Sequence, residues 1–115
     1  MENNKTTGEI LREKREEKGL LLRHVSAKLD IDTAILSKIE RGARKVSKEQ
    51  IIKLAKILDL DKEKLVVQYL SEKILYEIKD EELGEKALKV AEQKMKYIGR
   101  KSNESNSHKS KKSIK

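Results

Sequence analysis

The chain has 115 residues, of which 42% are charged and 3% aromatic, and its formal net charge is +8 at pH 7. It contains no cysteine, which excludes disulfides and thiolate metal sites. It also contains no proline, which together with the few aromatic residues favours helices over a β-sandwich or barrel. Residues 1–6 lack the apolar stretch of a secretory signal, and no apolar run could span a membrane. We therefore expect a soluble, cytoplasmic, all-α protein.

The first helix is expected over residues 7–18, after a flexible N-terminus of residues 1–6. Ile10 and Leu11 supply its apolar stripe, Thr6 or Thr7 can cap it, and Gly19 ends it. A second helix follows over residues 21–29, in which Leu22, Val25 and Leu29 recur at helical spacing.

The chain then breaks at residues 30–32, and a third helix is expected over residues 33–41. Asp32 can cap this helix, because its carboxylate can accept hydrogen bonds from the free amides of the first turn. Gly42 ends it, at a position that calls for a left-handed backbone. Two short helices joined by a tight polar turn are the pattern of a helix-turn-helix, whose second helix enters the major groove of DNA.

Two helices are expected next, each opened by a polar cap. Ser47 and Gln50 form the spacing of a capping box, and the helix after them buries Ile51, Leu54, Ala55 and Leu58. Asp61 can cap a further helix that runs to about Lys79. Its apolar face is too wide for one stripe, so we expect it to contact both its own core and a second surface.

The C-terminal part is expected to form a sixth helix over about residues 81–96 and then a tail. Apolar residues recur at helical spacing from Leu83 to Ile98, whereas Ser, Asn and Lys dominate from Gly99 onward. Residues 99–115 cannot bury enough apolar surface to order themselves, so we expect a disordered basic tail.

Positive charge is distributed unevenly along the chain. The net charge is +4 over residues 1–60, −1 over residues 61–98 and +5 over residues 99–115. Residues 33–48 hold five basic side chains against the single acid Glu40. That excess is expected where a protein meets the phosphates of nucleic acid, although a basic surface can also serve only solubility.

The spacing of residues 19–42 resembles that of the Cro/C1-type helix-turn-helix regulators of bacteria and phages, also called the xenobiotic-response-element family. Gly19-Leu20 closes the first helix, Val25-Ser26 supplies a buried aliphatic and a small residue, and Asp30-Ile31-Asp32 forms the turn. The ending Leu36-Ser37-Lys38-Ile39-Glu40-Arg41-Gly42 is highly specific to this family. The resemblance implies a five-helix, lambda-repressor-like DNA-binding domain over residues 7–70. The surplus apolar residues of the last two helices favour a helical dimerisation extension over residues 71–98.

The resemblance also implies which side chains meet DNA. The residues expected to face the bases are Thr33, Ala34, Ser37 and Lys38, whose hydroxyl, methyl and ammonium groups suit contacts with base edges. The residues expected to contact phosphate are Arg23, Arg41, Arg44, Lys45 and Lys48. The chain departs from the family at Leu21-Leu22, where a polar pair usually opens the second helix. Either the amides of that turn contact phosphate alone, or the leucines pack against another element.

Two charged residues suit a structural role, and no set of residues suits catalysis. The family commonly places an arginine at the position of Arg15, and we expect Arg15 and Glu40 to form a partly buried ion pair between the first and third helices. His24 and His108 lie too far apart for a transition-metal site. There is no phosphate-binding glycine loop and no nucleophile beside a base, so we expect neither an enzyme nor a cofactor.

We expect the protein to be a homodimer, because a lone helix-turn-helix makes few base contacts. The residues expected at the dimer interface are Val66, Leu70, Ile74 and Tyr76, together with the sixth helix. The alternative is that the sixth helix folds back and completes the monomer's core. The basic tail is expected to add sequence-independent attraction to nucleic acid, or only solubility.

The function expected from these features is sequence-specific binding of double-stranded DNA by a nucleoid-associated transcriptional repressor that recognises a palindromic operator. Two alternatives bind DNA as well: a restriction-modification controller, or an antitoxin whose last two helices bind a toxin. A third is a protein–protein adaptor that uses the same fold, with a partner such as polymerase. A DNA-reading helix needs small or polar residues on its outer face, as here, whereas an adaptor tolerates acids or bulky apolar groups.

Overall fold

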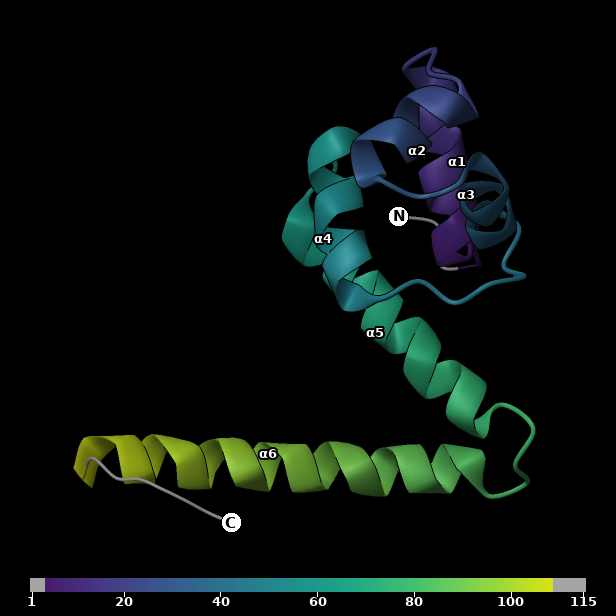
Figure 1. Ribbon diagram of the computed structural model, residues 1–115. Coiled ribbons are helices and arrows are strands. Elements are labelled where there is room, and N and C mark those ends of the chain that lie inside the picture. The colour runs from purple at the N-terminus through teal and green to yellow at the C-terminus, as the bar shows by residue number, and fades with distance from the viewer. Residues whose placement is uncertain (1–3, 109–115) are drawn as a thin grey trace. The chain divides into compact units, whose positions relative to one another are not determined.

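The computed structural model describes residues 4–108, and within this range it is all-helical (Figure 1). The chain separates into two compact units, and the boundary between them falls within the fifth helix, after Leu75. None of the helices in residues 4–108 combines the length and apolar character needed to cross a membrane. The helices are α1 (Thr7–Glu17), α2 (Leu22–Leu29), α3 (Thr33–Glu40), α4 (Lys48–Ile57), α5 (Lys62–Ile78) and α6 (Gly84–His108). This architecture confirms the predicted all-α class.

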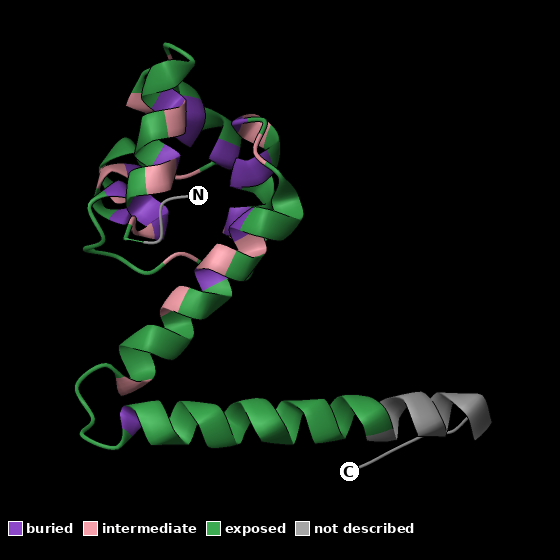
Figure 2. Cartoon of the chain, turned by 180° about the vertical axis from the view of Figure 1, so that it is seen from behind, coloured by how far each residue is buried: buried purple, intermediate pink, exposed green. Residues whose placement is uncertain are grey.

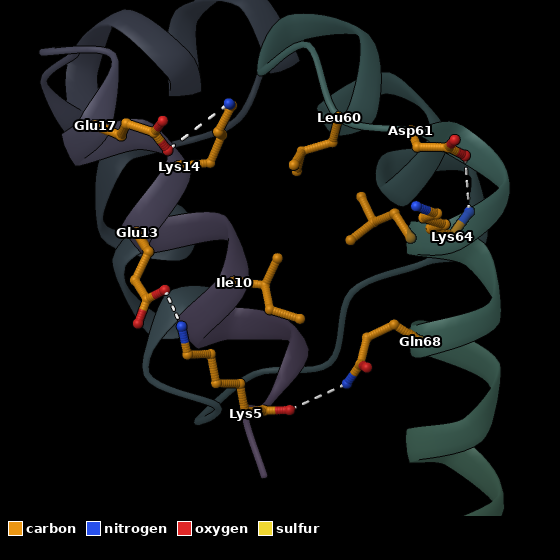
Figure 3. Close-up of a pocket in the computed structure, with 10 residues that line it drawn as sticks. Lys5, Ile10, Glu13, Lys14, Glu17, Leu60, Asp61, Lys64 and Gln68 are labelled. Atoms are coloured by element: carbon orange, nitrogen blue, oxygen red, sulfur yellow. Dashed lines mark hydrogen bonds and ion pairs between the residues drawn. The ribbon is translucent and has the colours of Figure 1, made fainter. Parts of the chain in front are cut away.

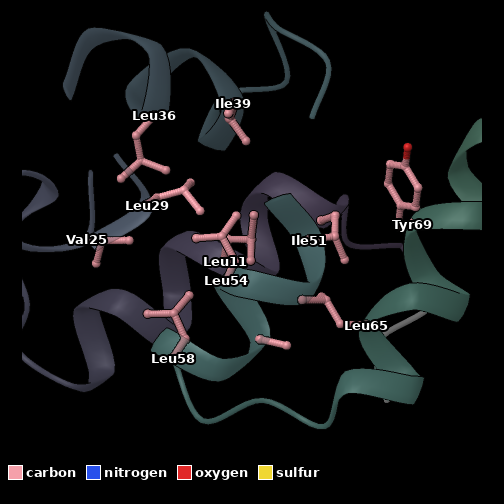
Figure 4. Close-up of a cluster of buried hydrophobic side chains, with 11 residues drawn as sticks. Leu11, Val25, Leu29, Leu36, Ile39, Ile51, Leu54, Leu58, Leu65 and Tyr69 are labelled. Atoms are coloured by element: carbon pink, nitrogen blue, oxygen red, sulfur yellow. The ribbon is translucent and has the colours of Figure 1, made fainter. Parts of the chain in front are cut away.

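The first unit is built around one apolar core to which all of its helices contribute (Figure 4). Packing joins α1 to α3, and α2 to both α3 and α4. Each helix buries the stripe that its spacing predicts, because residues three and four apart lie on one face. The buried apolar residues are Leu11, Val25, Leu29, Leu36, Ile39, Ile51, Leu54, Ala55, Leu58, Leu65 and Tyr69.

The helices of this unit begin at the caps that the sequence predicts. Thr6 caps α1 and exchanges hydrogen bonds with Glu9 in a capping box. Ser47 and Gln50 do the same at α4, and the Asp61 carboxylate accepts from the amide of Lys64 at α5. Thr6 is therefore part of the folded domain and not of a flexible N-terminus, whereas residues 1–3 lie outside the described range.

Helix α5 begins in the core and ends exposed. Leu65 and Tyr69 are buried, and Val66 is half-buried against the same core. Further along, Leu70, Ile74 and Tyr76 are 41%, 49% and 57% exposed. Of the four residues expected at a dimer interface, Val66 is thus largely used by the domain itself, and the other three are accessible in this chain.

Helix α6 begins later and ends later than the sequence predicts. Glu81 and Glu82 lie in the connection before α6 and not in its first turn, and the amide of Glu81 donates to the carbonyl oxygen of Ile78 at 3.0 Å. Gly84 is buried so close to the end of α5 that a Cβ there would lie 2.5 Å from the same carbonyl oxygen. The helix then continues through Gly99 to His108. No proline interrupts it, and serine, asparagine and lysine each weaken a helix only slightly. The tail expected from residue 99 thus starts no earlier than residue 109, and residues 109–115 lie outside the described range.

Candidate nucleic-acid interface

The turn between α2 and α3 is held by polar contacts at both of its ends. Asp30 adopts a left-handed conformation with φ of 62° and ends α2. Asp32 caps α3 by accepting a hydrogen bond from the amide of Ala34 at 3.1 Å. The hydroxyl oxygens of Ser26 and Thr33 lie 2.9 Å apart in a hydrogen bond that joins the two helices. These contacts fix the angle at which α3 leaves the turn.

One side of α3 is buried and the other is open. Leu36, Ile39 and Glu40 face the interior. The residues expected to face DNA bases lie on the outer side, where Thr33, Ala34 and Lys38 are exposed and Ser37 is half-buried. The Thr33 hydroxyl is already bonded to Ser26, so it has less freedom to contact a base than the ammonium group of Lys38.

The basic residues around the end of α3 form an exposed surface. Arg41, Arg44, Lys45 and Lys48 are all exposed. None of them forms an ion pair with another residue in the described part of the chain; the Arg41 Nε donates only to the Ser37 carbonyl oxygen, at 3.3 Å. We call these four residues the basic surface. Its cations are available to phosphate, because no carboxylate neutralises them.

Glu40, the only acid of residues 33–48, is buried and neutralised from α1. The Arg15 guanidinium donates to its two carboxylate oxygens at 2.8 and 3.1 Å, and also to the carbonyl oxygen of Leu20 at 2.8 Å. Arg15 is 9% exposed and Glu40 is 7% exposed. The hydrogen bond to Glu40 raises the pKa of Arg15 above its ordinary value. This is the ion pair expected from the sequence, and it removes the acid's charge from the surface that would face DNA.

The start of α2 shows what replaces the missing polar pair of the family. Leu22 packs against the core and Leu21 is 47% exposed. The amide of Leu21 donates to the Nδ1 atom of His24 at 3.0 Å, which is the half of a capping box made by the third helical residue, whereas Leu21 itself provides no side-chain cap. Arg23 beside it is exposed. This role of His24 was not predicted, although its place in the first turn of the helix was the available signal.

Three residues outside the helix-turn-helix also shape the site and were not predicted. Gly8, in the first turn of α1, lies directly against the backbone at the end of α3. Gln68 and Glu72 of α5 bond to the chain just before Gly8. Only the glycine gave a signal, because it stands in a helix otherwise composed of good helix formers. Among the described residues there is no group of three or more His, Cys, Asp and Glu residues that could hold a metal ion.

The two short helices, their tight turn and the basic surface define the class of DNA-binding helix-turn-helix proteins. Residues 11–65 match the family model described as Helix-turn-helix, so this part of the chain is similar to that family. The match supports a DNA-binding helix-turn-helix domain within these residues.

Two solved structures are similar to this chain over most of its length. The clp gene regulator ClgR from Corynebacterium glutamicum is 23% identical, with a TM-score of 0.50, and the match covers 84% of this chain and 88% of that one. A chain of the SinR protein/SinI protein complex is also 23% identical, with a TM-score of 0.49, and the match covers 84% of this chain and 99% of that one. No curated protein sequence matches the chain. At this identity the similarity to ClgR supports the fold.

Proposed function

We propose that the protein is a sequence-specific repressor that binds a palindromic operator as a homodimer. In this proposal α3 lies in the major groove, with Lys38 and Ser37 reading base edges and Ala34 beside a thymine methyl group. The basic surface and Arg23 contact the phosphates on either side. Binding at an operator represses by excluding other proteins from the same DNA, in the cytoplasm where the nucleoid lies.

The observation that carries this proposal is the composition of the outer face of α3. Its exposed residues are small, polar or basic, and Glu40, the one acid of the helix, is buried against Arg15. Phosphates would repel an exposed carboxylate, and a bulky apolar group would be poorly placed against base edges. The same face gives a protein partner little apolar area to bury, which favours DNA reading over an adaptor role.

Selection from a pool of random DNA duplexes tests the proposal directly. We expect the recovered sequences to share a consensus of two inverted half-sites, with centres about one helical turn, or 10 base pairs, apart. Binding without any shared sequence would contradict base reading and would leave only phosphate contact. A single half-site would contradict the palindromic operator.

The proposed dimer uses the exposed apolar residues of α5 and α6. Residues 85–100 of α6 are all exposed in this chain (Figure 2), and Leu88, Ala91, Met95 and Ile98 recur at spacings of three and four residues along the helix. Such a stripe favours pairing with another helix. In the proposed dimer, the other subunit would cover this apolar stripe of α6, which the described residues of one chain leave exposed.

Light scattering on the full chain tests the dimer. Ile74→Glu places a charge on the exposed segment of α5, and we expect the mass to fall from dimer to monomer. Ile52→Glu on α4 is the matched control, since Ile52 is also exposed but lies outside the proposed interface. A dimer that persists in Ile74→Glu, or one that Ile52→Glu disrupts equally, would contradict this interface.

A further inference from the structure

Helix α5 is bonded to the N-terminal end of α1 by residues more than sixty positions away in the sequence. Both carboxylate oxygens of Glu72 accept from the amide of Thr7, at 3.1 and 3.2 Å. One turn earlier, the Gln68 side chain donates to the carbonyl oxygen of Lys5 at 3.2 Å (Figure 3). Thr7 is 3% exposed, so water cannot replace the Glu72 contact without opening the packing there.

The residue after Thr7 lies against the end of the recognition helix α3. A Cβ on Gly8 would lie 2.4 Å from the carbonyl oxygen of Glu40 and 2.6 Å from that of Ile39. Both atoms belong to the backbone, so no flexible side chain is available to yield. The first turn of α1 and the last turn of α3 therefore touch backbone to backbone.

Glu40 is consequently held by α1 at two points. Its carbonyl group lies against Gly8, and its carboxylate is bonded to Arg15. The basic surface begins with the next residue, Arg41. Because closely packed backbones move together, a shift of the first turn of α1 must also move the end of α3 and the cations that follow it.

We infer that Glu72 is a positioning residue for DNA recognition: by fixing the first turn of α1, it sets where the end of α3 and the basic surface lie. This inference rests on the proposed function. Glu72 lies between Leu70 and Ile74 in the sequence of α5, so the same stretch of helix serves both the proposed dimer and the placement of α3. The contact thus connects the subunit interface to the DNA-reading helix.

The ratio of two affinities separates positioning from simple stabilisation. We would measure binding of the full chain to the selected operator and to a scrambled duplex of equal composition. Partial unfolding lowers both affinities by the same factor, so it leaves the ratio unchanged, whereas a misplaced α3 loses mainly the operator contacts. For Glu72→Ala we expect the ratio to fall about tenfold, roughly the discrimination of one good base contact.

Glu77→Ala is the matched control, because it removes the same charge from the same helix. Glu77 is exposed and has no hydrogen bond or ion pair within the described residues. We expect it to strengthen binding to both duplexes slightly, through lower charge repulsion, and to leave the ratio unchanged. If Glu72→Ala fails to fold, Glu72→Gln, which keeps one oxygen acceptor, is judged by the same ratio.

A second readout needs no DNA. The amides of Gly42 and Ala43 bond to the carbonyl groups of Ile39 and Lys38, so their NMR resonances report where α3 ends. We expect them to move in the Glu72 variant and to stay in Glu77→Ala. Unmoved resonances together with an unchanged ratio would overturn the inference. If the wild type recovers no consensus, the proposed function fails, and these resonances alone decide whether Glu72 positions α3.

Discussion

Gly8→Ala is the sharpest test of the packing between α1 and α3. The added Cβ would lie 2.4 Å from the carbonyl oxygen of Glu40, where ordinary contact begins at 3.4 Å. One backbone must therefore retreat from the other by about 1 Å, because the neighbouring atoms belong to a helix end that cannot rotate away. Overpacking of this kind costs about 1–3 kcal/mol.

Urea unfolding followed by circular dichroism measures this cost. Alanine is better than glycine in a helix by about 1 kcal/mol, so the observed loss in Gly8→Ala is the overpacking cost reduced by that gain. Gly99→Ala is the matched control, since it also lies within a helix but has open space around it. We expect Gly8→Ala to unfold at lower urea than the wild type, and Gly99→Ala at the same concentration or higher.

A free energy of unfolding that rises in Gly8→Ala by the full helix gain of about 1 kcal/mol would refute this reasoning. It would mean that α1 and α3 separate without cost and that their close approach does not constrain the recognition helix. The proposed effect of Glu72 on α3 would then lack the contact between Gly8 and Glu40 through which it acts.

Three further substitutions test the site and its surroundings. Arg15→Met leaves the buried carboxylate of Glu40 without its partner and should lower the free energy of unfolding by about 3 kcal/mol, measured in urea; a loss below about 1 kcal/mol would indicate an exposed pair. Lys38→Ala should relax the operator preference at one base pair by about 1–3 kcal/mol in competition binding, and an equal loss on every sequence would identify a phosphate contact. The hydrogen bond from Lys18 lowers the pKa of Asp59 below its ordinary 3.8. The contact between Lys18 and Asp59 therefore stabilises the fold above pH 3.8, and this stabilisation is lost as the pH falls through the lowered pKa. In Lys18→Ala the pKa of Asp59, followed by NMR, should rise toward 3.8; an unchanged titration would show that the contact is not formed in solution.

Most of the predictions that hold depend on neighbours in the sequence. Asp32, Ser47 and Asp61 open their helices because a cap bonds to amides two or three residues away. The family resemblance placed Arg15 beside Glu40, although 25 positions separate them. The end of α6 differs from the prediction, because a composition that indicates little burial does not by itself stop a helix, and α6 continues past Gly99.

The sequence by itself determined the helix-turn-helix, its caps, its core stripes and its basic surface, since each follows from local spacing and residue type. Only the tertiary structure revealed the contacts that hold α3 in addition to the Arg15–Glu40 pair. The approach of Gly8 to Glu40 and the bond from Glu72 to Thr7 join helices far apart along the chain. No periodicity encodes such contacts, because they depend on the distance between backbones that the folded core brings together.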